Sequence, residues 1–312
     1  MSPESADWTI GKLIEWTRGF FEKKGIPQPR LEAEILLAHV LGAERIDLYM
    51  RYEQAVAEDQ RAAFRELVRR RAEREPTRYL TGGCEFMSLA MKVTPACLIP
   101  RPETERLVEE VLRLAGMPRR PAGAAAAGAS AEQLPAPISL IDLCTGCGCI
   151  AVSLAVYLPH ARVTATDLSA EALAVAHLNA EAHGVADRMT LLAGDLYEPL
   201  DAADVQPADF LVANPPYVAE AEWAALAPEI REHEPRAALV AGPAGTEIVE
   251  RLLKGAPAYL RPGGRLLMEI GNEQGGAAAA QAAAVRGLAD VEVLKDYAGL
   301  DRILMARREA KE

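Results

Sequence analysis

The stretch Asn214-Pro215-Pro216-Tyr217 combines groups that can grip a planar amine: a side-chain amide, backbone carbonyls and an aromatic face. The prolines cannot donate backbone hydrogen bonds and restrict the residues before them, so regular structure ends here. The apolar run 208–213 in front of the stretch predicts a buried strand. We therefore expect a stiff turn at the carboxyl end of that strand, where ligands bind in open α/β sheets. The alternative is a proline-rich turn in which Asn214 only caps the chain.

A second candidate site is the loop 144–148, which follows a predicted strand at 139–143. Gly146 and Gly148 let the backbone come close to a ligand, and the helix that follows presents free amide groups. Asp167 ends the next predicted strand, about twenty residues past the loop, where a carboxylate can accept hydrogen bonds from ribose hydroxyls. The pattern predicts a nucleotide-like cofactor. Since the loop lacks a complete G-x-G-x-x-G, a NAD-dependent oxidoreductase stays open here, although no hydride-transfer residues follow.

The five cysteines are Cys84, Cys97, Cys144, Cys147 and Cys149. The last three have the spacing of part of a metal site, but no second Cys or His pair at zinc spacing follows them. An odd count without a signal peptide argues against a disulfide framework. We expect small, half-buried loop thiols and no metal.

Charge divides unevenly along the 312 residues, whose net charge is −11. Residues 1–76 hold 13 Lys and Arg against 14 Asp and Glu, whereas the remainder holds 21 against 31. An acidic body does not suit binding to a phosphate backbone, so we expect no direct nucleic-acid binding. No apolar run is long enough to span a bilayer, and the N-terminus lacks a basic start and an apolar core. We expect a cytoplasmic protein without membrane contact.

The chain order predicts three segments: a helical domain at 1–76, a β-hairpin linker at 77–100 and an α/β domain at 101–312. Residues 116–137 are rich in Pro, Ala and Gly and predict a flexible connection. Beyond them, strands and helices alternate as in a parallel sheet with right-handed crossovers. The predicted strands are 139–143, 162–166, 189–192, 209–213, 265–270, 291–294 and 302–306, and the predicted helices are 150–157, 170–183, 246–258 and 273–286.

Taken together, these elements predict a Rossmann-like domain with a seven-stranded, mostly parallel sheet and an antiparallel last strand. The cofactor would lie over the first two strands, and the amine-gripping turn would end the fourth. This arrangement suits the transfer of a methyl group from S-adenosylmethionine to nitrogen.

The chain resembles the protein-glutamine N-methyltransferases that act on peptide chain release factors, the HemK/PrmC type, over nearly its whole length. The stretch 98–105, Leu-Ile-Pro-Arg-Pro-Glu-Thr-Glu, is the most selective part, because an Asn-Pro-Pro-Tyr turn alone is shared with DNA adenine methyltransferases. The other matching motifs are residues 74–82, Asp142-Leu143-x-Thr145-Gly146-x-Gly148-x-Ile150-Ala151, Asp167-x-Ser169-x-x-Ala172-Leu173, Asn214-Pro215-Pro216-Tyr217, Glu234-Pro235 and Glu269-Ile270-Gly271.

The resemblance implies methylation of the glutamine side-chain amide in the Gly-Gly-Gln motif of class I release factors during translation termination. It implies that the Asn214 side-chain oxygen and the Pro215 carbonyl accept hydrogen bonds from the glutamine NH2, while Tyr217 packs on the amide. The helical domain would be a second docking surface for the release factor. The candidate catalytic residues are Asn214, Pro215 and Tyr217, with Pro216 added for substrate binding. The candidate cofactor-binding residues are Cys144, Thr145, Gly146, Cys147, Gly148, Asp167, Leu196 and Asn214.

Two positions depart from the family pattern: Cys144 replaces a usual glycine, and Leu196 stands where other members often carry an aromatic residue. We expect a loop slightly farther from the cofactor and a weaker contact with adenine. A nucleic-acid amino methyltransferase and a non-catalytic adaptor of the same fold remain alternatives. The first needs a basic groove, and the second need not keep Asn214 and Asp167.

Overall fold

The structure, a computed structural model, describes residues 8–117 and 137–310. Most of the predicted flexible connection at 116–137 lies outside these described residues. The chain divides into two compact units, which we call the helical unit (Met1–Gly82 with Ala227–His233) and the sheet unit (Gly83–Leu226 with Glu234–Glu312). Within the described residues, no helix is both long and apolar enough to cross a membrane.

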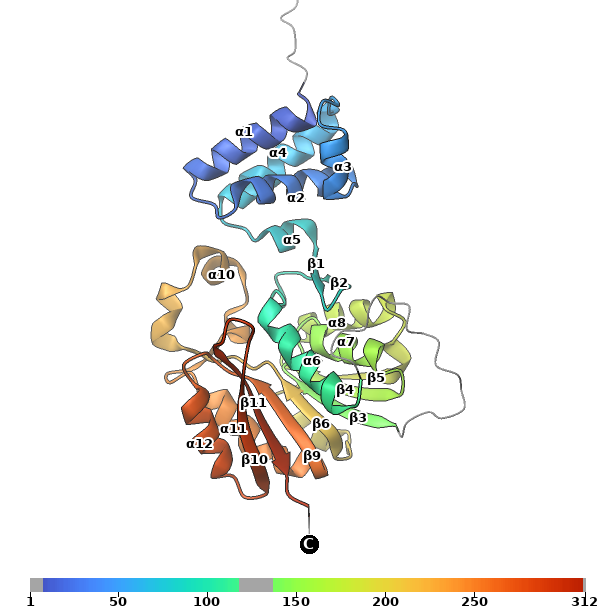
Figure 1. The fold of residues 1–312 in the computed structure, drawn as a ribbon, viewed down its shortest axis with the longest axis vertical. Helices are drawn as coiled ribbons and strands as arrows, with labels where there is room; N and C mark the ends of the chain where they lie inside the picture. The colour runs from blue at the N-terminus through green and yellow to red at the C-terminus, as the bar shows by residue number, and fades with distance from the viewer. Residues whose placement is uncertain (1–7, 118–136, 311–312) are drawn as a thin grey trace, which may run out of the picture. The chain divides into compact units, whose positions relative to one another are not determined.

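The helical unit contains α1 (Ile10–Lys23), α2 (Pro29–Leu41), α3 (Arg45–Met50), α4 (Glu58–Ala72), α5 (Thr77–Thr81) and α10 (Pro228–His233) (Figure 1). The Thr9 hydroxyl caps α1 by accepting a hydrogen bond from the Lys12 N–H, and Gly42 ends α2 with a φ of 58°. Apolar side chains at helical spacing meet in one buried cluster. Its largest members include Ile14, Phe21, Leu36, Leu37 and Phe64.

A buried charge cluster joins α10 to the rest of the helical unit. The Arg71 side chain is only 5% exposed and lies 2.9 Å from a Glu32 carboxylate oxygen and 3.3 Å from one of Glu229. Arg74 also reaches Glu229, at 3.1 Å. A buried guanidinium needs such partners, because an unpaired charge in the interior is costly.

The segment after Pro76 corrects one prediction. The β-hairpin linker was predicted over residues 77–100, but Thr77–Thr81 is the short helix α5, and Leu98–Ile99 forms no strand. Pro76 precedes the helix and Gly82, at a φ of 74°, ends it, so the local turn outweighs the strand preference of Tyr and Thr. The hairpin itself is present as β1 (Gly83–Phe86) and β2 (Leu89–Lys92), which pair antiparallel.

The sheet unit is built on seven strands: β3 (Ile138–Leu143), β4 (Ala161–Asp167), β5 (Met189–Ala193), β6 (Ala208–Ala213), β9 (Leu260–Glu269), β10 (Leu288–Lys295) and β11 (Asp301–Arg308). They lie in the order β10-β11-β9-β6-β3-β4-β5. The pairs of β6 with β3 and β9, and of β4 with β3 and β5, are parallel, whereas β11 runs antiparallel to both β9 and β10. The predicted seven-stranded sheet is confirmed. Its antiparallel last strand lies inside the sheet, since β10 takes the edge.

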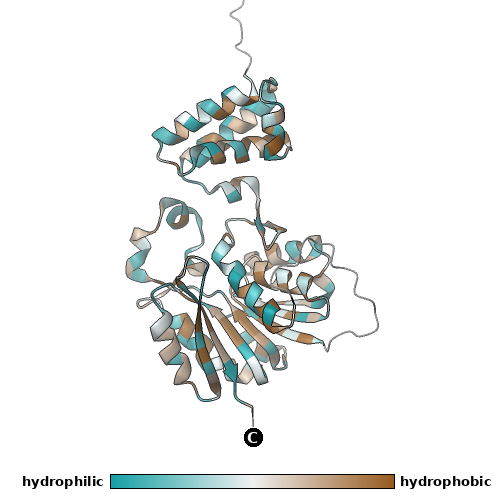
Figure 2. Ribbon diagram, in the orientation of Figure 1, coloured by the Kyte–Doolittle hydropathy of each residue, from teal (hydrophilic) through white to brown (hydrophobic). Residues whose placement is uncertain are grey.

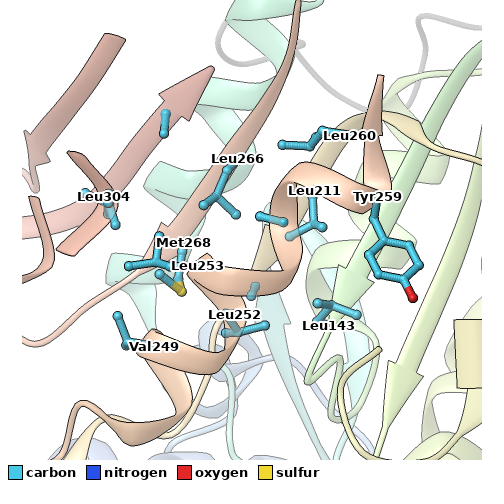
Figure 3. Close-up of a cluster of buried hydrophobic side chains, with 14 of the residues drawn as sticks. Leu143, Leu211, Val249, Leu252, Leu253, Tyr259, Leu260, Leu266, Met268 and Leu304 are labelled. Carbon is cyan, nitrogen blue, oxygen red and sulfur yellow. The ribbon is translucent and has the colours of Figure 1, made fainter. Parts of the chain in front are cut away.

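The helices of this unit are α6 (Glu105–Leu114), α7 (Cys149–Tyr157), α8 (Ala170–Ala182), α9 (Glu198–Ala202), α11 (Glu247–Tyr259) and α12 (Gly275–Ala283). Short 3₁₀ turns occur at η1 (Pro102–Thr104), η2 (Ala186–Arg188), η3 (Glu220–Ala225) and η4 (Arg236–Ala238), and β7 (Val218–Ala219) pairs with β8 (Val240–Gly242). Right-handed crossovers place α7 and α8 on one face of the sheet and α11 and α12 on the other. The α11 side is filled by Leu252, Leu253, Leu266, Met268 and Leu304 (Figure 3).

Strands covered on both faces are hydrophobic almost throughout, and Figure 2 shows hydrophobic residues concentrated along the central strands. Strand order reverses between β3 and β6, because the crossover from β3 leads to β4 on one side and the crossover from β6 leads to β9 on the other. Such a switch point opens a crevice at the carboxyl ends of the strands.

Candidate active site

A cavity of about 670 Å³ lies at this edge of the sheet unit. Its size is in the range of small-molecule sites. Of the predicted site residues, the cavity is lined by Cys144, Thr145, Gly146, Cys147, Asp167, Leu196, Asn214 and Pro216. Gly148, Pro215 and Tyr217 are not among the described residues that line it. The structure therefore brings the loop after β3, the end of β4 and the turn after β6 to one cavity.

Backbone groups of the loop after β3 and of β4 shape this loop. The Thr145 N–H donates to the Thr166 carbonyl at 3.0 Å, and Gly146 and Gly148 adopt positive φ angles of 57° and 80°. A Cβ atom on Gly148 would lie 2.9 Å from the Cβ of Ala176. Gly148 thus allows α7 to pack closely on α8, whereas Gly146 belongs to the surface that faces the cavity.

Asp167 holds this loop with one carboxylate oxygen and the start of its own following segment with the other. Oδ2 accepts a hydrogen bond from the Gly146 N–H at 2.7 Å, and Oδ1 accepts one from the Ser169 N–H at 2.9 Å. Burial raises the pKa of Asp167, and the two N–H donors oppose that shift. Each oxygen keeps a further lone pair, and Asp167 lines the cavity. The carboxylate organises the loop, which the sequence did not suggest, and it can also accept from a ligand hydroxyl.

Asp142 is fully buried at the end of β3, where its Oδ2 accepts a hydrogen bond from the Thr145 hydroxyl at 2.6 Å. Burial raises its pKa to about 7, while the Thr145 hydroxyl lowers it and the charge of Asp167 adds to the rise. Asp142 was noted in the loop motif without a role. It is a buried titratable group, and its hydrogen bond to Thr145 supports the loop.

We expect Asp142 to make the protein less stable as pH rises. Its native pKa of about 7 exceeds the ordinary value of 3.8, so the native state binds its proton more tightly than the unfolded state does. This contribution is present below about pH 4 and is lost as pH rises through about 7. Urea unfolding from pH 4.5 to 8 should show a steeper loss in the wild type than in Asp142→Asn. Equal slopes would contradict the expectation, and the exposed Asp187→Asn is the control.

Cys144 occupies a left-handed conformation, with a φ of 60°, and its side chain packs against the core on the α11 side of the sheet. This explains why glycine suits the position, since a Cβ atom in this region costs about 1 kcal/mol or more. Burial raises the pKa of the Cys144 thiol, which keeps it protonated. Among the described residues, no group of three or more His, Cys, Asp or Glu side chains is placed to hold a metal ion.

Glycine at position 144 should be more stable than alanine by about 1 kcal/mol, because only alanine keeps a Cβ atom in the left-handed region. The comparison of Cys144→Gly with Cys144→Ala by urea unfolding measures this difference. The same pair at Cys149, the first residue of α7, is the control, and there alanine should be favoured. An alanine variant at 144 as stable as the glycine variant would count against backbone strain at this position.

The Asn214 turn follows β6, whose Ala213 pairs with Met268 of the neighbouring strand β9. Asn214 is half-buried and lines the cavity. The Gln274 side chain secures the backbone after the turn, because its Nε2 donates to the carbonyl oxygens of Tyr217 at 3.0 Å and Gly245 at 3.1 Å. These two hydrogen bonds fix the backbone where the turn ends.

Two buried residues that were not predicted as site residues connect this turn to its surroundings. The Thr104 hydroxyl donates to Glu269 Oε2 at 2.6 Å, and the Tyr217 hydroxyl donates to Glu269 Oε1 at 3.2 Å. The Asn214 Nδ2 lies 3.3 Å from the Thr104 Oγ1. Burial raises the pKa of Glu269, against the opposing effects of the Thr104 hydroxyl and the Arg302 charge. The available signal was a carboxylate that directly follows the apolar run Leu266-Leu267-Met268.

The cavity has the acceptor, donor and apolar groups that a nucleoside cofactor needs. Asp167 supplies a carboxylate, the loop and the start of α7 supply backbone amides, and Leu168, Leu196 and Ile248 supply apolar surface. Leu168 is 70% exposed, so its side chain is available to a ligand. Leu196 is buried and Asp195 lies beside it, paired with Arg251 at 2.7 Å. These residues fit adenosine bearing a charged chain.

Comparisons with known proteins first give the class. Residues 12–82 match the family model of the PrmC N-terminal domain, and residues 127–237 match that of the methyltransferase small domain. The crystal structure of the hMettl16 catalytic domain with an RNA hairpin has the same fold, with a TM-score of 0.54 and 18% identity, over 72% of this chain and 77% of that one. The fold and the matched domain define a methyltransferase.

Relatives similar over nearly their whole length give the family. Release factor glutamine methyltransferases from Rhodopirellula baltica and Geobacter sulfurreducens are 42% and 41% identical to this chain. The first match covers 96% of this chain and 97% of the relative, and the second covers 98% and 99%. The Chlorobaculum tepidum protein is 43% identical, over 96% and 97%. This chain belongs to the release factor glutamine methyltransferase family.

Proposed function

We propose that this enzyme transfers a methyl group from S-adenosylmethionine to the side-chain amide nitrogen of a glutamine in peptide chain release factors. The target is the glutamine of their Gly-Gly-Gln motif, as the family resemblance implies. The observation that carries the proposal is that Asn214 lines the same cavity as Asp167 and the Gly146 loop. This shared lining supports a site in which the turn after β6 binds the substrate amide next to a cofactor at the ends of β3 and β4.

The residues of the chain act by alignment. An amide nitrogen is a poor nucleophile because its lone pair is delocalised, and the bound cofactor supplies an activated methyl group. We assign the Asn214 side-chain oxygen and the Pro215 carbonyl as acceptors for the two N–H groups of the substrate amide. They hold the lone pair in line with the methyl group and stabilise positive charge as it develops on nitrogen. Tyr217 packs beside the amide and excludes water.

For the cofactor, we assign ribose binding to Asp167 and backbone contacts to the loop 144–148. Gly146 lines the cavity with its backbone, and Cys147 lies next to it. Gly148 acts indirectly, through the close packing of α7 on α8. Leu196 contributes apolar contact to the adenine from its buried position at the cavity wall.

The charge distribution favours a protein substrate over DNA or RNA. Residues 77–312 hold 21 basic against 31 acidic side chains, which opposes binding to a phosphate backbone. The hMettl16 structure contains RNA, but its 18% identity supports a common fold alone. We assign a docking role to the helical unit. Every described residue that lines the cavity belongs to the sheet unit, so the helical unit is left to recognise the release factor.

One incubation tests the proposal: the protein with methyl-labelled S-adenosylmethionine, purified release factor and DNA together. We expect label in the release factor, and none after its loop glutamine is changed to alanine. Label in the DNA would support the amino methyltransferase alternative. Label in neither, from protein shown by calorimetry to bind the cofactor, would support the non-catalytic adaptor.

A further inference from the structure

The acceptor role assigned to Asn214 depends on which way its side-chain amide faces. An asparagine amide can present either its oxygen or its NH2 group after a half turn, and the surrounding hydrogen bonds decide between them. With its NH2 group toward the substrate, Asn214 would oppose the substrate NH2. Something in the protein must therefore select one orientation.

The selecting group is the Thr104 hydroxyl, which has one hydrogen to donate. Its Oγ1 lies 2.6 Å from Glu269 Oε2, the distance of a strong hydrogen bond to a carboxylate. The hydrogen is thereby used, so Thr104 can only accept from its other neighbour. That neighbour is Asn214 Nδ2 at 3.3 Å. The carbonyl oxygen of Asn214 must then occupy the opposite side of the amide.

The position of Glu269 makes it a stable acceptor for the Thr104 hydroxyl hydrogen. It follows Met268, the partner of Ala213 across the β6–β9 pair, which brings it level with Asn214. Its other oxygen accepts from the Tyr217 hydroxyl at 3.2 Å. Thr104 and Glu269 are each only 1% exposed, so water does not compete for these bonds.

We infer that Thr104 and Glu269 are positioning residues that hold the Asn214 amide with its oxygen available to the substrate. The inference rests on the proposed function of Asn214 and adds what makes that residue an acceptor. It also gives a role to the threonine in the stretch 98–105, since η1 (Pro102–Thr104) delivers this side chain to the site.

Thr104→Val tests the inference, because valine keeps the shape of threonine without the hydroxyl. We expect kcat to fall at least 10-fold, with the cofactor Kd and the thermal midpoint nearly unchanged. Thr104→Ser restores the hydroxyl and should recover most of kcat. Thr190→Val, on an exposed position of β5, is the matched control. A folded Thr104→Val enzyme within twofold of wild-type kcat would overturn the inference, as would equal losses in the valine and serine variants.

A second measurement reads the amide orientation itself. A release factor with glutamate in place of its loop glutamine presents acceptors only, so it should inhibit Thr104→Val more strongly than the wild type. Unchanged inhibition in the variant would contradict the inference. If the valine variant does not fold, Thr104→Ala is compared in the same two assays. Wild-type activity on the release factor tests the proposed function separately, because it does not depend on any Thr104 variant.

Discussion

Asn214→Ala should reduce turnover by about 100-fold or more while leaving cofactor binding intact. The change removes one preorganised acceptor at the developing charge, and such groups contribute about 3 kcal/mol to catalysis. Cofactor affinity should persist because the loop 144–148 follows β3 and Asp167 ends β4, whereas Asn214 follows β6. Single-turnover methylation of the release factor measures the first effect, and calorimetry with S-adenosylhomocysteine measures the second.

Asn272→Ala is the matched control for this experiment, because Asn272 is exposed and follows the neighbouring strand β9. It should turn over like the wild type. Full activity of Asn214→Ala would remove the acceptor assignment. A loss of cofactor binding equal to the loss of turnover would instead show that Asn214 serves the cofactor, which it can reach from the cavity wall.

Asp167→Ala should weaken cofactor binding by about 100-fold. Two hydrogen bonds to a charged acceptor contribute about 1.5 kcal/mol each, and the ribose would supply both donors. The same carboxylate also holds the N–H groups of Gly146 and Ser169, so the loop should loosen as well. Calorimetry gives the Kd, and Asp187→Ala, on an exposed position, is the control. An unaltered Kd would exclude the ribose role.

A double-mutant cycle separates ribose binding from loop support. S-adenosylhomocysteine and its 2′,3′-dideoxy analogue are each measured against the wild type and Asp167→Ala. If the carboxylate meets the ribose, removing the hydroxyls should weaken binding to the wild type and change little in the variant. Equal weakening in both proteins would assign Asp167 to the loop alone.

Hydrophobic patterning was sufficient to predict the strands of the sheet. Strands that are buried on both faces are apolar almost throughout, so each one can be recognised from its own residues. Every predicted strand of the seven-stranded sheet lies within an observed one or extends one residue beyond it, and the turn after β6 was predicted at its observed position. Predicted element bounds were less accurate where prolines and glycines occur. Strand β9 was predicted to begin at residue 265, but it begins at Leu260 and passes through an irregular stretch that contains Pro262 and Gly263.

The parts of the site that the sequence did not reveal depend on contacts between distant residues. Thr104 and Glu269 are 165 positions apart, and Thr104 and Asn214 are 110 apart. A polar residue in a motif shows which groups are present, but only the packed fold shows where its hydrogen points. The loop-supporting roles of Asp142 and Asp167 were hidden for the same reason.

The seven residues Ala227–His233 make the helical unit discontinuous in the chain. A fragment ending at Gly82 would leave Arg71 and Arg74 without Glu229, their partner from α10. Because Arg71 is buried, such a fragment would carry a partly uncompensated charge in its interior. Isolated helical modules made for binding studies should therefore include α10 through a short linker. The natural chain already supplies it, by crossing between the two units at three points instead of one.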